Sequence, residues 1–435
     1  MSGMSPLLAS IAAPLHPFFR AAGGEGFEDL LLALVAIVAA TKLLGELAQR
    51  IGQPAVLGEL IAGVLLGGSV LGLIDPADPV LYAFAELGVL ILLFEIGLHT
   101  DLRALAKVGS TAITVGVVGV VLPFAGGFLA ARALGVEMLP SIVIGAALTA
   151  TSIGISARVL SDLGQLRTPE GQVVIGAAVF DDVVGLIILS IVAAAARGAE
   201  VSATGITRTS VTAVGFVVLA VGLGSVAIPP LFAALEKVRQ RGALGIIALG
   251  FALLVAWVAS RAGSAMIIGA FAAGLILHPT PQRKEIERSV TRIGFLFVPI
   301  FFASVGAAVD LAALASVRAL TVGAALIAVG FAGKVVAGYA PWWFKGNKLL
   351  VGVAMVPRGE VGLIFAQMGL VSGALAGELF GALMLMVVVT TFVTPPLLVA
   401  IAERQSPGAQ HAPDESGIDD LVSGSNRRTA EHAQP

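Results

Sequence analysis

Two adjacent carboxylates, Asp181 and Asp182, lie in the middle of the hydrophobic run from Gln172 to Ala196, which is long enough to cross a bilayer. Keeping one charged side chain at this depth costs at least about 2.5 kcal/mol, so packing alone does not explain the pair. Neighbouring helix positions differ by about 100°, so one carboxylate can face a basic partner while the other faces a water-filled cavity. The pattern predicts a site for cations and protons in the middle of the membrane.

Lys334 lies in the middle of another apolar segment. A buried ammonium group needs a carboxylate partner or loses its proton. The alternative is a lysine that extends to the membrane surface, because Tyr339 and Trp342 mark an interface one or two turns away. We favour a buried ion pair between Lys334 and either Asp181 or Asp182.

Polar residues interrupt the apolar segment at 140–160, where Thr149, Thr151 and Ser152 follow one another closely. Their hydroxyl and carbonyl oxygens are the ligand type that hard alkali cations prefer. The alternative is that these hydroxyls bond back to their own helix. Both interpretations of the three residues stay open on the sequence alone.

A second interruption, in the segment 347–371, contains Pro357, Arg358 and Glu360. Pro357 removes a backbone donor, and the freed carbonyls and half-helix ends can coordinate a cation. Arg358 can neutralise the C-terminus of a half-helix, and Glu360 an N-terminus or a neighbouring base. A purely structural role for both residues remains as open as a direct contact with the ion.

Three further acids are weaker candidates. Glu59 lies near the end of a span, where it can simply be interfacial, whereas Glu86 and Glu95 can line a cavity.

The chain also repeats itself. Three pairs of residues recur at almost the same separation: Gly97 and Gly306 at 209 residues, Asp101 and Asp310 at 209, and Gly63 and Gly274 at 211. An odd number of spans separates the equivalents, so the two halves are inverted, as in many secondary transporters. The same offset carries Thr151 onto Glu360, so the two interruptions correspond. Interrupted segments at matching positions indicate the binding site of a transporter.

The bulk composition is that of a membrane protein. The chain has 435 residues, of which 57% are hydrophobic and 12% charged, with a mean hydropathy of +0.98; soluble domains carry about 25% charged residues. Without cysteine it forms no disulfide and no thiolate metal site, and its five histidines show no metal spacing. A net charge of −2 disfavours nucleic acid as a partner. We expect no enzyme activity and no cofactor, because no nucleophile–base set is visible.

Hydropathy predicts an all-α protein with about thirteen spans. Their limits are 27–46, 54–74, 80–98, 108–131, 140–160, 172–196, 209–234, 241–260, 263–278, 291–308, 316–340, 347–371 and 378–401. Lys and Arg number fourteen in one set of loops and six in the other. The richer side is expected to be cytoplasmic, which places the N-terminus outside and the C-terminus inside. Residues 1–26 are expected to form a short tail, and residues 402–435 a disordered cytoplasmic tail.

With these residues in hand, the chain resembles bacterial sodium/proton antiporters of the monovalent cation:proton antiporter-2 family, nearest to the electrogenic members with thirteen helices. The resemblance covers about residues 27–401. It rests on Phe180-Asp181-Asp182, the break at Thr149–Gly154, Lys334, Pro357-Arg358-Gly359-Glu360 and the run Phe301–Gly306.

The resemblance implies a core domain with two broken crossing helices, a separate dimerisation domain and elevator-like movement of the core. The dimerisation helices would be 27–98 and 241–308, the core halves 108–196 and 316–401, and a linker helix 209–234. Asp182 would be the main ion-binding carboxylate, and Asp181 would pair with Lys334 when no cation is bound. Thr151 and neighbouring carbonyls would complete the cation shell.

The expected function is exchange of a monovalent cation, Na⁺ or alternatively Li⁺ or K⁺, for protons in the plasma membrane by a homodimer. Cation and proton would compete for Asp182. If the Lys334 pair also exchanges a proton, exchange is electrogenic, with about two protons per cation. The alternatives are an electroneutral or potassium-preferring antiporter, a cation channel, and a membrane sensor without transport.

Overall fold

The computed structural model describes residues 27–196, 243–309, 316–371, 373–375 and 377–405, with a few single positions between 207 and 230. The regular elements of these ranges are helices. They are α3 (Phe27–Arg50), α4 (Ala55–Leu66), α5 (Pro79–His99), α6 (Leu102–Lys107), α7 (Gly109–Ala133), α8 (Met138–Ala147), α9 (Ile153–Asp162), α10 (Pro169–Ala196), α12 (Ala243–Arg261), α13 (Met266–Leu277), α14 (Arg283–Ala307), α15 (Val317–Tyr339), α16 (Lys348–Ala354), α17 (Glu360–Val371) and α18 (Gly377–Gln405).

The expected all-α, multi-pass class is confirmed. Seven helices of the described part are long and apolar enough to cross a membrane, and α4, α8 and α13 are shorter apolar helices. The seventh expected span, 209–234, and the expected tail 1–26 lie outside the described residues apart from a few single positions. Helix α18 continues to Gln405, four residues past its expected end, and the rest of the expected C-terminal tail is also outside them.

Local signals in the sequence explain where several helices begin. Asp78 caps α5 by accepting hydrogen bonds from the amides of Val80 and Leu81, and Pro79 occupies the first helical turn. Asn347 caps α16 in the same way through the amide of Leu350. These caps fix the depth at which each helix starts.

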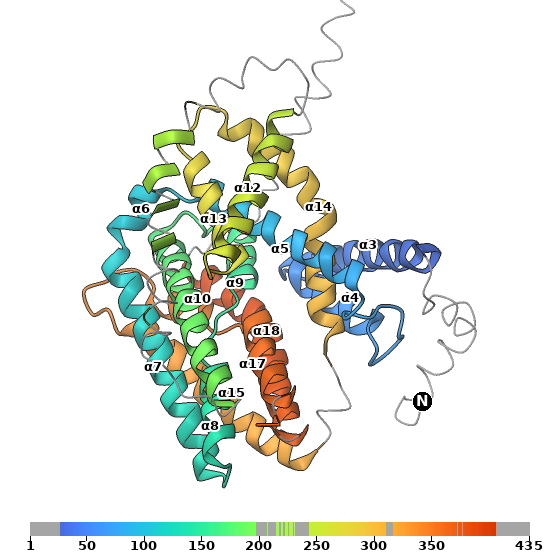
Figure 1. Cartoon of the computed structure of the whole chain (residues 1–435), viewed down its shortest axis with the longest axis vertical. Helices are drawn as coiled ribbons and strands as arrows, with labels where there is room; N and C mark the ends of the chain where they lie inside the picture. Colours follow the sequence, from blue (N-terminus) through green and yellow to red (C-terminus); the bar gives the residue numbers. More distant parts are fainter. Residues whose placement is uncertain are drawn as a thin grey trace, which may run out of the picture.

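The helices pack as two groups. One consists of α3, α4, α5, α12, α13 and α14, and the other of α7, α8, α10, α15, α16, α17 and α18. In Figure 1, α3, α4 and α14 lie on the right, and α7, α8, α10 and α15 on the lower left. Helix α9 lies between the groups, because it contacts α4 and α5 of the first and α10 and α18 of the second.

Glycines bring helices of the first group into backbone contact at two crossings, Gly63 of α4 with Gly306 of α14, and Gly97 of α5 with Gly274 of α13. At each of the four positions an added Cβ would lie 2.1–2.3 Å from a carbonyl oxygen of the opposite helix. The two crossings correspond through the sequence repeat, because Gly63 matches Gly274 and Gly306 matches Gly97. The two halves therefore repeat the same helix–helix contacts as well as the same residues, and small residues allow the close approach at each contact.

The same correspondence holds at the ends of these helices. The Ser69 hydroxyl donates to the carbonyl of Val309 at 2.6 Å, and Nδ1 of His278 lies 2.8 Å from the carbonyl oxygen of Leu98. Ser69 and His278 are 209 residues apart, and Leu98 and Val309 are 211 apart. In each half, the end of one long helix is thus hydrogen-bonded by a side chain that comes from the other half.

Candidate ion site at the crossing of two broken helices

Two helices are interrupted in the middle of the molecule, between α8 and α9 at residues 148–152, and between α16 and α17 at residues 355–359. Pro357 has no amide hydrogen to continue α16. The amides and carbonyls freed at each break need partners at this depth, because lipid offers none.

The two breaks supply partners to each other. Three hydrogen bonds join them: the Ser152 amide to the carbonyl of Pro357 at 2.8 Å, the Thr151 hydroxyl to the carbonyl of Met355 at 3.2 Å, and the Ser156 hydroxyl to the carbonyl of Ala354 at 2.5 Å. Gly359 packs against the side chain of Ser152, because a Cβ on Gly359 would lie 2.5 Å from the Ser152 hydroxyl oxygen. The crossing is thus held by main-chain and hydroxyl contacts.

Arg358 is fully buried and reaches from the second break to the first. Its Nη1 donates to the carbonyl of Thr149 at 3.3 Å and to the carbonyl of Ala150. These carbonyls follow the C-terminus of α8, where a positive charge offsets the negative end of the helix dipole. The geometry suits the half-helix role that the sequence suggested for Arg358. Glu360 opens α17, and its side chain lies outside the described residues.

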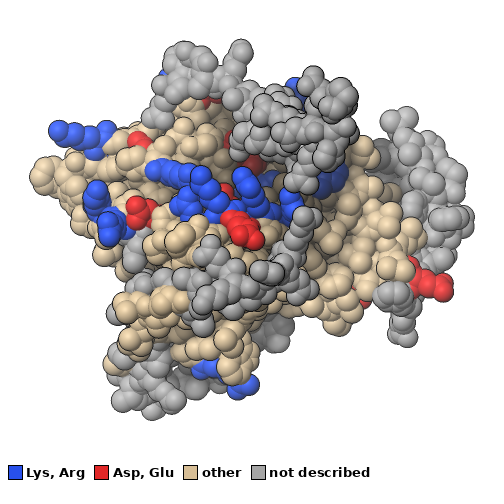
Figure 2. Space-filling view, turned by 90° about the horizontal axis from the view of Figure 1, so that it is seen from above, with Lys and Arg blue, Asp and Glu red and all other residues tan. Residues whose placement is uncertain are grey.

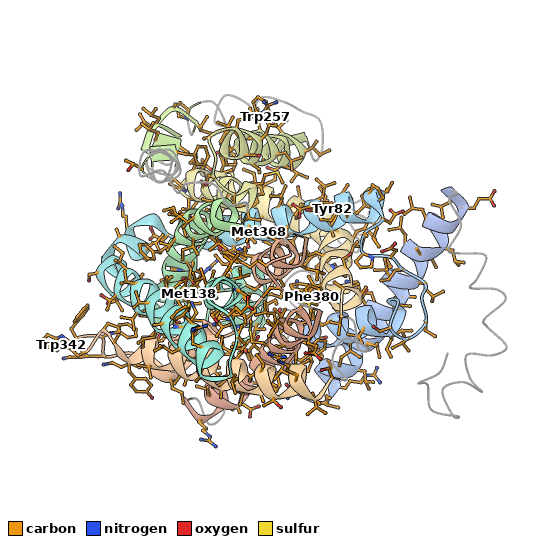
Figure 3. All side chains as sticks on the ribbon, turned by 60° about the horizontal axis from the view of Figure 1, so that its bottom comes forward. Tyr82, Met138, Trp257, Trp342, Met368 and Phe380 are labelled. Atoms are coloured by element: carbon orange, nitrogen blue, oxygen red, sulfur yellow. The ribbon has the colours of Figure 1, made fainter. Side chains whose placement is uncertain are left out.

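Asp181 forms a buried ion pair at the same crossing. Nζ of Lys334 lies 2.7 Å from Asp181 Oδ2, and both side chains are fully buried. The Thr151 hydroxyl donates to the same oxygen at 2.5 Å. Lys334 therefore does not extend to the surface, whereas Trp342 is 80% exposed and lies at the edge of the molecule (Figure 3). Asp181 thus joins α10, α15 and the first break.

The remaining candidates lie close by in different surroundings. Asp182 is buried in α10 next to Asp181, with 6% of its surface exposed. The Thr149 hydroxyl donates to the carbonyl of Ala146 at 2.7 Å, so it bonds back to its own helix. The Ser152 hydroxyl is buried and has no hydrogen-bond partner among the described residues. Of the three hydroxyls, the one that contacts the acidic pair is that of Thr151.

Small residues on α7 make room for this site, which sequence reasoning missed. A Cβ on Gly119 would lie 3.3 Å from Nζ of Lys334, and a Cβ on Gly116 would lie 2.6 Å from the ring of Phe180. The chain has 53 glycines, so a single sequence does not distinguish Gly116 and Gly119 from the others. Ser156, which bonds to the second interrupted helix, could have been found from the sequence, because it is a polar residue in the interrupted apolar segment.

A polar cavity lies between α5 and α9, with an empty volume of about 320 Å³. Glu95 and His99 of α5 line one side, and Arg158, Ser161 and Asp162 of α9 line the other. Arg158 pairs with Asp162 at 3.2 Å. The cavity therefore lies between the first helix group and α9, and charged side chains line it.

Helices α4 and α14 extend this polar region. Glu95 accepts a hydrogen bond from the Thr291 hydroxyl at 2.5 Å, and Nε2 of His99 lies 2.7 Å from Glu287. Glu59 is only 3% exposed, so it is buried within the protein, and the interfacial interpretation of its depth stays a prediction. It lies inside α4, where it interacts electrostatically with Arg158, because α4 packs against α9.

Two interrupted helices that cross around buried charges are the architecture of an ion-coupled secondary transporter. The sodium/hydrogen exchanger transmembrane family matches residues 33–404, and the chain belongs to that family. The expected antiporter family is thereby confirmed.

Relatives of known name agree with this assignment. The chain is 40% identical to the high-affinity Na⁺/H⁺ antiporter NhaS3 of Synechocystis, over 92% of this chain and 96% of that one. It is 35% identical to the Na⁺/H⁺-K⁺ antiporter GerN of Bacillus cereus, over 85% and 95%. The sodium proton antiporter MjNhaP1 of Methanocaldococcus jannaschii shares the fold, with a TM-score of 0.69 at 16% identity over 89% of this chain and all of that one.

Proposed function

We propose that this chain exchanges Na⁺ for protons, with Asp182 as the main ion-binding carboxylate. The observation that carries the proposal is the pairing of Lys334 with Asp181 at 2.7 Å beside the crossed breaks. That pair compensates the charge of Asp181, and Asp182 is buried directly beside it in α10. The names of NhaS3 and GerN support Na⁺ as the cation.

The mechanism is competition for negative charge. A proton or a cation neutralises Asp182, and a neutral site crosses the apolar barrier more readily than a charged one. Thr151, Ser152 and carbonyls of the first break supply oxygen ligands for the cation. Thr151 already bonds to Asp181, so cation binding there weakens the pair of Asp181 with Lys334.

Exchange is electrogenic in this proposal. The cation displaces one proton from Asp182, and a second proton leaves Lys334 when Asp181 turns to the cation. About two protons then move against one cation, because the coupled groups titrate together. A dye that reports membrane potential in proteoliposomes tests this stoichiometry, and an electroneutral exchanger gives no signal.

Alternating access is proposed to be elevator-like. The helix group with α3, α4, α5, α12, α13 and α14 serves as the dimerisation domain, and the group with the broken helices moves as the core. The packing of the helices as two groups supports this division. Cross-linking in native membranes tests the homodimer.

The proposed orientation places the C-terminus and the end of the molecule that carries α6 in the cytoplasm. Figure 2 looks down on that end and shows several Lys and Arg side chains gathered there beside a few acidic ones. The basic residues of α6 and of the first turns of α14, Lys107 and Arg283 among them, belong to the loops that carry more positive charge. The membrane is proposed to be the plasma membrane.

The decisive experiment is a Na⁺-driven pH change in liposomes that contain the purified protein. Wild type is expected to acidify or alkalinise the lumen according to the Na⁺ gradient. Asp182→Asn is expected to abolish the response, and full exchange in this variant with unchanged Na⁺ affinity would reject the site. Substituting K⁺ for Na⁺ in the same assay tests a potassium-preferring exchanger, which the name of GerN makes the second candidate.

A further inference from the structure

The sequence repeat extends to the acidic pair itself. Moved by 209 residues, the limits of α10 become 378 and 405, within one residue of the limits of α18. The same offset carries Asp181 onto Thr390 and Asp182 onto Thr391. In the second half, two threonines thus stand where the first half has its two carboxylates.

Thr391, the counterpart of Asp182, bonds to the second break, whereas in the first half it is Asp181 that bonds to the first break. Its hydroxyl donates to the carbonyl of Arg358 at 2.5 Å, across 33 residues. Asp181 accepts from the Thr151 hydroxyl at 2.5 Å, across 30 residues. In each half, a side chain near the middle of a long helix therefore holds the interrupted helix of the same half.

The Thr391 hydroxyl lies in apolar surroundings and bonds across to the break, whereas the Thr390 hydroxyl bonds back to its own helix. Thr391 is 2% exposed, and the other residues that line the small cavity beside it, from α14 and α18, are apolar. An unpaired hydroxyl or carbonyl in such a place costs about 1–3 kcal/mol. The hydrogen bond to Arg358 is thus the contact that fixes the peptide at the second break.

The Arg358 side chain connects this peptide to the ion site. Nη1 holds the carbonyls of Thr149 and Ala150, directly before Thr151 and its bond to Asp181. Nε and Nη2 are buried without a hydrogen-bond partner among the described residues. Few contacts therefore hold the guanidinium, and its position depends on the backbone that carries it.

We propose that Thr391 is a positioning residue of the ion site. Its hydroxyl fixes the Arg358 peptide, and the guanidinium in turn holds the carbonyls of the first break where a cation binds beside the acidic pair. The proposal rests on the proposed function for the identity of the ion, and on the contacts for the role of Thr391.

The test compares three variants of α18 in proteoliposomes. Thr391→Val removes the hydroxyl and keeps the shape, whereas Thr391→Ser keeps the hydroxyl. Thr390→Val is the matched control, because the Thr390 side chain is equally buried and its hydroxyl bonds, among the described residues, to Met386 and Val387 of its own helix. Half-saturating Na⁺ and maximal rate are measured for each.

Thr391→Val is expected to raise the half-saturating Na⁺ about tenfold, as losses behind a metal site do, with a smaller change in maximal rate. Thr391→Ser and Thr390→Val are expected to stay near wild type. An unchanged half-saturating concentration in Thr391→Val, or an equal effect in Thr390→Val, overturns the proposal in favour of packing. Failure of serine to restore affinity overturns it as well.

Na⁺ binding to the purified proteins, measured by calorimetry, separates this proposal from the proposed function. The affinity is expected to fall by the same factor in Thr391→Val. Wild type that binds Na⁺ without exchanging it would reject the function, and the ratio of affinities would still decide the role of Thr391. Equal affinities in wild type and Thr391→Val overturn the positioning role.

Discussion

Asp181 and Asp182 are adjacent in sequence and therefore lie on different faces of α10. Asp181 accepts from Lys334 and Thr151, so its charge is compensated within the protein. Asp182 occupies another face of α10, where the helix turn of about 100° places it. The two acids can therefore divide the work, with one holding the site together and the other exchanging ions.

Protonation at Asp182 competes with Na⁺ in this arrangement. The half-saturating Na⁺ is therefore expected to rise as the pH falls, by at most about tenfold per pH unit for one competing proton. Initial rates of exchange at a series of Na⁺ concentrations, measured at several pH values, check the slope. A half-saturating concentration that does not depend on pH while the maximal rate falls would contradict competition.

The pair of Lys334 with Asp181 is expected to contribute to stability as a unit. Lys334→Ala leaves a buried carboxylate without compensation, at a cost of about 3–5 kcal/mol. The double variant Asp181→Asn with Lys334→Gln removes both charges and is expected to be less destabilised than the sum of its single variants. Thermal unfolding of the purified proteins checks this, and additive losses would mean that the two groups are not coupled.

At the scale of elements, the breaks of α8–α9 and α16–α17 stabilise each other. Freed groups of one break bond to the other, and Arg358 compensates the end of α8. The polar backbone of the two breaks thus finds partners where the two interrupted helices meet. The site depends on the close approach of these helices as much as on its charged side chains.

Gly359→Ala tests this close approach. The added methyl group would lie 2.5 Å from the hydroxyl oxygen of Ser152, so the breaks must separate, at a cost of about 1–3 kcal/mol. We expect weaker Na⁺ binding and a lower unfolding temperature. Gly362→Ala is the control from the same helix, since its methyl group finds its nearest neighbour, Val387, at 3.5 Å. Equal effects of the two substitutions in binding and unfolding measurements would speak against the crossing as the sensitive element.

At the scale of the whole molecule, the two cavities beside the ion site differ in the polarity of their lining. The cavity between α5 and α9 is lined by Glu95, Arg158 and Asp162, whereas the seam between α14 and α18 is lined by apolar residues except for Thr391. Water and ions favour the polar side. We infer that the site is reached from the end with α5 and α9 in this conformation.

Single cysteines can report this access, because the chain has none of its own. Ser161→Cys in the polar cavity is expected to react with a membrane-impermeant thiol reagent added from the cytoplasmic side. Val387→Cys in the apolar seam is expected to stay unlabelled from the other side. Labelling efficiency in vesicles of known orientation measures both. The reverse pattern would contradict the orientation or the direction of access.

The sequence by itself determined the class of this protein and the places where chemistry is possible. Long apolar runs require helices in lipid, and an acidic pair, a lysine and two interruptions are expensive enough at that depth to stand out. The shared offset of Gly97 and Gly306 also revealed the two related halves. These signals are local or periodic, so they are visible without coordinates.

Only the tertiary structure decided which of these groups meet. Lys334 pairs with Asp181 across 153 residues, Thr149 bonds back to its own helix, and Glu59 is buried within the protein. The reason is physical: both lipid and protein core are apolar, so hydrophobic periodicity does not fix how a membrane helix is rotated about its axis. Backbone contacts such as that of Gly63 with α14 fix the rotation, and they exist only once both helices are in place.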